Sequence, residues 1–227
     1  MGLAEQQRCL ARLYTDRAFR QGFFADPRGT AEAEGLPPRE ARQLAALSPR
    51  EVGLFARSLR HKRCNEAAKL LPRTRGVLGL RFGQLFARFA DGKNPGGMRK
   101  YREEALAFAA FLAQEARHGR LEPAWVGDLV RYEGAWLQMT DPTVWCMARW
   151  FRYPVGVLAG TVARGEISSG ARPQRTMALW FRPGRAGRLR HVVFPVWPLR
   201  AGRLWLPSSI LSSQPPPPPD GHLLSDR

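Results

Sequence analysis

Apolar residues recur at three- and four-residue spacing through the first 140 residues, the pattern of helices with one buried side. The pattern breaks at residues such as Pro27, because proline ends one helix and fits the first turn of the next. An opening helix that stops before Pro27 is marked by Leu10, Leu13, Tyr14, Phe23 and Phe24. The sequence therefore predicts an all-helical domain over residues 1–140.

A long helix is predicted from residue 49 to about residue 71. Ser48 and Glu51 form a capping box at its start, and Pro72 ends it because proline has no amide hydrogen. We expect its buried side to consist of Leu54, Phe55, Leu59, Ala67, Leu70 and Leu71.

A basic cluster lies on this helix and just beyond it. Its members are His61, Lys62, Arg63, Lys69, Arg73 and Arg75. The cluster is either a binding site for a polyanion or the solvent-exposed side of an ordinary helix. Lys62, Arg63 and Lys69 are expected on one exposed stripe that also carries Glu66, which favours the solvated side because opposite charges pair at these spacings.

Three further helices are predicted. The segment from residue 74 to 92 carries Gly79, Gly83 and Ala87 beside its apolar side, which predicts close approach of another helix because interior glycine is otherwise costly. The next helix ends near Gly119, and the last begins at Pro123. The expected buried residues of the three are Leu78, Phe82, Leu85, Phe86, Phe89, Tyr101, Ala105, Phe108, Leu112, Trp125, Leu129, Tyr132 and Trp136.

The pattern changes beyond Pro142, where short aromatic and β-branched runs alternate with Gly, Pro and Arg. The runs "TVWCMARWFRYPVGVLAGTVA", "RTMALWFRPG", "LRHVVFPVWPL" and "GRLWLP" predict a small antiparallel sheet, with "RPGRAGR" as a hairpin connection. Five consecutive prolines follow in the last stretch. We expect an α+β protein: a helical domain over 1–140, a β-rich domain over 141–206, and a disordered proline-rich tail over 207–227.

The charge adds a preference for anionic partners. The chain has 36 basic and 19 acidic residues, a formal charge of +17. Residues 141–203 hold 11 basic and 2 acidic residues, a balance of +9 in 63 positions. Such a charge attracts nucleic acid, an anionic membrane surface or an acidic protein, although 32 of the basic residues are arginine, a bias that GC-rich coding also produces. Without an uninterrupted apolar run near the N-terminus, we expect neither a signal peptide nor a membrane span, and a cytoplasmic location.

The sequence lacks the motifs of the common catalytic and phosphate-binding sites. His61 and Cys64 have ligand spacing on one helix, but no third ligand lies nearby, so no metal and no cofactor are expected. Asp128 and Glu133 are five residues apart and diverge around a helix, which disfavours a paired acid and base. We therefore predict that the protein is not an enzyme.

Four stretches within residues 45–160 carry a resemblance to a known family: "LLPRTRGVLGLRFGQLFARFADGKNPGG", "YREEALAFAAFLAQ", "LEPAWVGDLVRYEGAWL" and "FRYPV". They resemble a bacterial family that is labelled a DNA-binding domain and includes accessory subunits of methanobactin and bufferin maturation. Separately, "LYTDRAFRQGFFADPRGTAEAEGLPPREARQL" is similar to the small non-catalytic subunit of LigAB-type extradiol dioxygenases.

The first resemblance implies an adaptor without activity of its own. Its helical domain would dock a modifying enzyme, such as a TIM-barrel iron enzyme, and its β domain would recruit a peptide along a sheet edge. Acidic residues of that peptide would pair with Arg175, Arg182, Arg188 and Arg190. The alternative is a nucleic-acid-binding protein that stacks bases on Trp150, Phe151 or Trp180 beside arginines.

Overall fold

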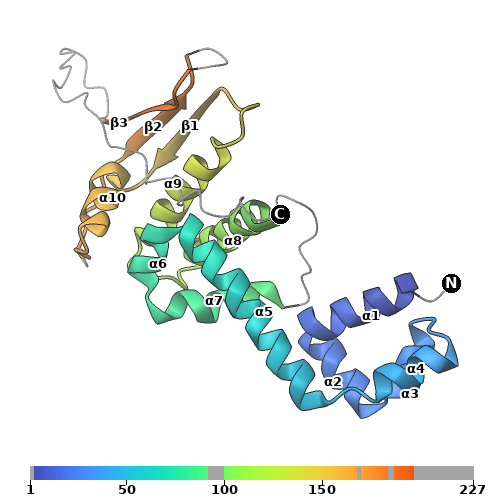
Figure 1. Ribbon diagram of the computed structural model, residues 1–227. Coiled ribbons are helices and arrows are strands. Elements are labelled where there is room, and N and C mark those ends of the chain that lie inside the picture. Colours follow the sequence, from blue (N-terminus) through green and yellow to red (C-terminus); the bar gives the residue numbers. More distant parts are fainter. Residues whose placement is uncertain (1–2, 92–99, 168–169, 184–186, 197–227) are drawn as a thin grey trace, which may run out of the picture. The chain divides into compact units, whose positions relative to one another are not determined.

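A computed structural model describes residues 3–91, 100–167, 170–183 and 187–196, which form ten helices and three strands (Figure 1). The strands make one antiparallel sheet, so the expected α+β class is confirmed. The run at 202–207 and the tail at 207–227 lie outside the described residues. Among the helices that are described, none combines the length and apolar character needed to cross a bilayer.

The chain divides into two compact units. The first comprises Met1–Ala67 and Leu80–Glu104, and the second comprises Ala68–Gly79 and Ala105–Arg227. The divisions fall inside helix α5 (Pro49–Leu70) and helix α8 (Lys100–Arg117), and at Gly79. The domain boundary expected near residue 140 lies within the second unit, because the sheet belongs with helices that precede it.

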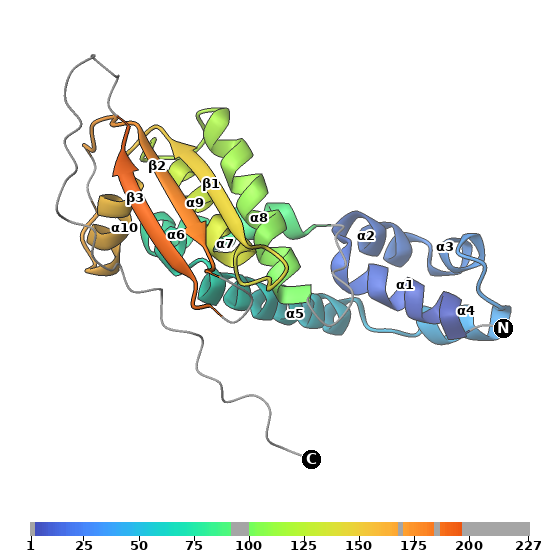
Figure 2. The same ribbon diagram turned by 90° about the horizontal axis from the view of Figure 1, so that it is seen from above.

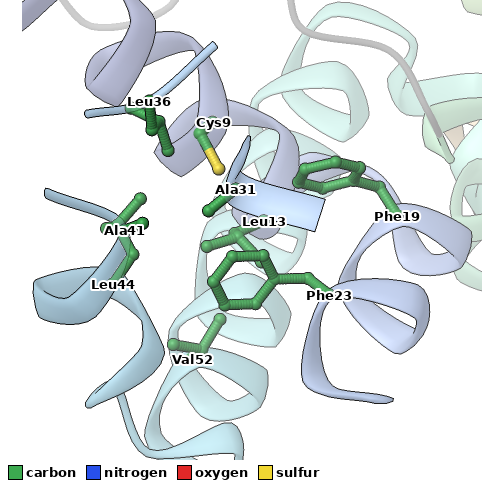
Figure 3. Packing of buried hydrophobic residues seen from close by; sticks show 9 residues of the cluster. All are labelled: Cys9, Leu13, Phe19, Phe23, Ala31, Leu36, Ala41, Leu44 and Val52. Atoms are coloured by element: carbon green, nitrogen blue, oxygen red, sulfur yellow. The ribbon is translucent and has the colours of Figure 1, made fainter. Parts of the chain in front are cut away.

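The first unit contains α1 (Leu3–Thr15), α2 (Arg17–Ala25), α3 (Pro27–Ala33), α4 (Pro38–Ala45), most of α5, and α7 (Leu80–Ala90). Asp16 and Asp26 cap α2 and α3 by accepting amide hydrogens three residues ahead. Apolar side chains from α1 to α5 then form one core (Figure 3): Cys9, Leu13, Phe19, Phe23, Ala31, Leu36, Ala41, Leu44 and Val52.

Helix α5 has nearly the expected bounds but a different buried side. The amide of Glu51 donates to Ser48 Oγ at 3.4 Å, which is one of the two bonds of a capping box. The buried residues are Val52, Ala56, Arg63 and Ala67. Leu54 and Phe55, expected inside, are instead 49% and 53% exposed because the core of α1 to α4 packs against the side of α5 that carries Val52.

The segment from residue 74 to 92 is broken at Gly79 into α6 (Pro72–Leu78) and α7, and its expected buried residues Leu78, Phe82, Leu85, Phe86 and Phe89 are confirmed. Gly79 has φ +55°, a conformation that favours glycine and ends α6. A Cβ at Gly79 or Gly83 would meet no described atom within 4 Å. The expected close approach of another helix at these glycines is therefore wrong.

Helix α9 (Val126–Gln138) is buried on most of its surface and lies at the centre of the second unit, against α6, α10 and strand β1. The expected burial of Trp125, Leu129 and Tyr132 is confirmed. A Cβ at Gly127 would lie 2.6 Å from the Cβ of Ala116 in α8, so glycine is required where these helices meet. A Cβ at Gly134 would contact Ala109 at an ordinary 3.6 Å.

The sheet has the order β1 (Cys146–Phe151), β2 (Thr176–Phe181), β3 (Arg190–Pro195), and Figure 2 shows α9 behind one of its faces. The segment after β1, expected to be β structure, instead forms helix α10 (Val155–Ala163). Its buried residues Val155, Leu158, Ala159 and Val162 have helical spacing, which outweighs the strand preference of valine.

Candidate functional site

The basic residues predicted for binding separate into exposed and internal side chains. In the first unit, His61 and Lys62 are exposed. Arg63, expected on the exposed stripe, is only 5% exposed and forms a buried ion pair with Glu104, with Nε 2.9 Å from the carboxylate. Arg63 therefore joins α5 to the first turns of α8 and is closed to a partner.

In the second unit, Lys69 and Arg75 are exposed, whereas Arg73 and Arg182 are partly buried. Arg73 Nε donates to the carbonyl of Ala159 at 3.2 Å, and Arg182 donates to the carbonyl of Met139. These two guanidinium groups thus hold the fold together. Sequence spacing could not reveal this, because both acceptors lie about forty residues or more away along the chain.

The arginines of the sheet lie at its two ends. Arg175 directly precedes β2, whereas Arg182, Arg188 and Arg190 lie where β2 ends and β3 begins. Arg175, Arg188 and Arg190 are exposed. They therefore remain candidates for contact with carboxylates, at opposite ends of the strands.

Strand β1 has an open edge in the described sheet. Trp145 accepts the amide hydrogen of Arg182, so hydrogen bonds to β2 come from odd-numbered residues of β1. The amide and carbonyl groups of Cys146, Ala148 and Trp150 consequently point away from β2. Side chains already bond two of the carbonyls: Arg131 donates to Trp150 at 2.9 Å and Arg149 to Ala148 at 3.3 Å.

The other edge, on β3, is less suited to pairing. The amide of Val196 donates to the carbonyl of Arg175, so even-numbered residues of β3 form the backbone hydrogen bonds to β2. The backbone amide and carbonyl groups of the odd-numbered residues His191, Val193 and Pro195 therefore point away from β2. Pro195 has no amide hydrogen to donate. A further strand would therefore find a more complete set of donors on β1.

The sheet face that points away from α9 is mostly apolar. Residues directly opposite each other share a face, and Ala178 and Trp180 are buried towards the helices. The opposite face consists of Cys146, Ala148, Trp150, Met177, Leu179, Phe181, Arg190, Val192 and Phe194. Of the aromatics expected to stack on bases, Phe151 and Trp180 belong to the core, whereas Trp150 is 58% exposed.

A groove of about 140 Å³ lies between α8, α9 and the inward side of β1. Its floor is lined by small and aliphatic side chains, and its rim carries Arg131, Gln138 and Arg149. The sequence analysis did not select these three. Arg131 could have been noticed as the basic residue of a helix that otherwise carries only acidic charges, Asp128 and Glu133.

Two carboxylates of α9 position neighbouring chain segments. Glu133 is buried and accepts the amide hydrogens of Arg73 and Thr74 at 2.9 and 2.8 Å, which caps α6. Asp128 accepts the amides of Arg152 and Tyr153 at 2.6 and 3.0 Å, which holds the turn after β1. Burial raises the pKa of Glu133, while its bonds to Thr74 and Arg73 oppose that shift.

His191 lies among aromatic rings under the sheet. Its ring centroid is 4.9 Å from those of Trp136 and Trp180 and 5.3 Å from that of Tyr132. Burial lowers the pKa of His191 to about 4. The imidazole is therefore neutral at physiological pH and fills the core rather than acting as a cation.

Within the described part of the chain, no three His, Cys, Asp or Glu side chains lie close enough together to hold a metal ion. His61 and Cys64 therefore belong to no such group. Residues 45–114 match a family model described as the C-terminal domain of SCO6045-like proteins. The match covers α5, α6, α7 and most of α8. No curated protein matches the chain.

Proposed function

We propose that this protein is a non-enzymatic adaptor that recruits a peptide along strand β1 and docks a modifying enzyme through its helical part. The observation that carries the proposal is the open edge of β1. An extended peptide can continue the sheet there by bonding to the outward amides of Cys146 and Ala148 and to the outward carbonyl of Cys146. The basic charge of this region favours an acidic peptide.

The enzyme would contact the exposed side of α5. Leu54 and Phe55 are large apolar side chains that are about half exposed there, with His61 and Lys62 further along the same helix. An apolar patch beside a polar rim is typical of protein interfaces. The TIM-barrel iron enzyme remains a proposal that rests on the resemblance in sequence.

Proline at Ala148 tests the peptide site. The amide of Ala148 faces the open edge, so Ala148→Pro leaves the bonds between β1 and β2 in place while its ring obstructs an added strand. Random peptides displayed on phage are selected on the immobilised full chain. We expect enriched peptides whose binding weakens at least tenfold on Ala148→Pro but not on Ala148→Ser, which keeps the amide. No enrichment, or equal binding to both variants, contradicts the peptide site.

The enzyme contact is tested by co-purification from the native host and mass spectrometry. We expect one enzyme at near-native stoichiometry with the unaltered chain, and its loss on Leu54→Glu. The control is Ser58→Glu, which adds the same charge at an exposed position one turn away on α5. Recovery of no enzyme, or equal loss with both variants, argues against this contact.

Single-stranded nucleic acid is the second candidate ligand, and the exposure of Trp150 and Trp145, at 58% and 54%, favours it. Arg190 shares the outer sheet face with Trp150 and could bind a phosphate while the indole stacks on a base. A labelled oligothymidylate should then bind at about 50 mM salt and much more weakly at about 200 mM. Absence of binding at the lower concentration removes this candidate.

A further inference from the structure

The groove beside β1 owes its shape to small residues. Gly134 of α9 faces Ala109 of α8, where an added Cβ would lie 3.6 Å from the Cβ of Ala109, and both residues line the groove. The apolar lining residues are Leu106, Ala109, Ala110, Ala113, Val130, Gly134 and Ala135. Ala107 and Ala110 are exposed on α8. Because alanine is short and uncharged, neither side chain covers the groove.

The volume of the groove is suited to one apolar side chain. It measures about 140 Å³, and an apolar cavity of roughly 150 Å³ holds a benzene molecule. A side chain between leucine and phenylalanine in size would therefore fill it. A longer apolar segment or a whole helix would exceed it.

The charged residues at the rim of the groove indicate which residue of a bound chain would lie beside that apolar side chain. Arg131 is paired with Asp128 at 3.0 Å and also bonds to the Trp150 carbonyl. Arg149 is exposed, and its side-chain bonds go to Gln138 at 3.4 Å and to its own strand, with no carboxylate partner among the described residues. A carboxylate on a bound chain would complement Arg149.

We propose that the groove is a specificity pocket of the peptide site: it takes a Leu- to Phe-sized residue, and Arg149 takes an acidic residue two positions further along the peptide. The proposal rests on the function proposed above, since the peptide reaches the groove as a strand added to β1. Alternate side chains of a strand point to one face, and Arg149 faces the groove from β1. An apolar and an acidic residue at i and i+2 would thus meet the groove and Arg149 together.

The probe is a fluorescein-labelled, threonine-rich peptide that carries the sequence Leu-Thr-Glu, and binding to the full chain is followed by fluorescence anisotropy. Replacing its leucine by alanine should weaken binding about tenfold, because most of the apolar area that fills the groove is removed. Ala110→Leu fills the groove from the protein side and should have a similar effect. Ala107→Leu is the matched control, an exposed alanine of α8 that does not line the groove.

Charge reversal tests the second half of the motif. Arg149→Glu should reverse the preference of the protein from the glutamate probe to the same probe with lysine, whereas Arg172→Glu, an exposed arginine outside the groove, should not. If Ala148→Pro abolishes binding but Ala110→Leu and the leucine replacement have no effect, the pocket is refuted and the strand site stands. If the probe does not bind, the pocket is refuted; if it binds regardless of Ala148→Pro, the strand site fails as well.

Discussion

Replacement of Glu133 by glutamine should lower the free energy of unfolding of the second unit by about 3 kcal/mol. Each carboxylate oxygen accepts one amide, Oε1 from Arg73 and Oε2 from Thr74, and the side chain is buried. Glutamine keeps one acceptor and turns an NH₂ donor towards the other amide. One bond to a charged acceptor, about 1.5 to 3 kcal/mol, is lost, and a buried amide is left unsatisfied. The carboxylate's own cost of burial, which raises its pKa, offsets part of that loss.

The measurement is urea unfolding followed by tryptophan fluorescence. All seven tryptophans of the chain lie beyond residue 104, in the second unit, so this signal reports that unit alone. The midpoint should fall while the slope of the transition stays constant, as expected when stability changes without a change in the surface exposed.

Asp128→Asn is the matched control on the same helix. Both amides that Asp128 accepts reach a single oxygen, Oδ2, so asparagine can keep both bonds. Its other oxygen pairs with Arg131, whose side chain is 41% exposed. The loss should be about 1 kcal/mol or less, as for other exposed pairs. Equal losses for the two variants would refute the argument that the bonding pattern of each oxygen sets the cost.

Three further outcomes are expected. Arg63→Ala should cost about 3 to 5 kcal/mol in unfolding followed by circular dichroism, because it leaves Glu104 buried without its partner, whereas Lys62→Ala, at an exposed site, should change stability by about 0.5 kcal/mol or less. His191 binds a proton more weakly in the folded state than in the unfolded state. The free energy of unfolding should therefore be highest above pH 6.5 and fall by about 2 kcal/mol as the pH drops to about 4. His191→Phe should flatten this pH dependence, and an unchanged pH profile in the variant would contradict the prediction. Gly127→Ala should destabilise by about 1 to 3 kcal/mol because its Cβ would meet Ala116 at 2.6 Å, while Gly134→Ala, with a contact at 3.6 Å, should be nearly neutral by thermal melting.

Sequence features that act within a few residues, such as caps, prolines, glycines and aromatic runs, were sufficient to predict several helices and strands. The capping box and Pro72 bound α5, Gly119 follows α8, and the aromatic runs at β2 and β3 form strands. Helix α10 was mistaken for a strand because valine and threonine favour strands, while its burial against α6 and α9 depends on the tertiary fold.

The candidate site was less accessible from sequence. Arg63 finds Glu104 41 residues away, and Glu133 caps α6 from 59 and 60 residues away. The pattern of charges on one helix contains no information about such partners. The open edge of β1 depends on strand order and register, which the sequence runs leave undetermined.

The difference between the two strand edges limits how copies of this chain could self-associate. Proline at position 195 discourages growth from β3, so edge-to-edge contact between described sheets would use β1 of both molecules. Such a contact is its own complement and closes after two copies. Growth of a fibre from such a pair would need the edge of β3 in the described sheet, where Pro195 removes one of the three outward amide donors.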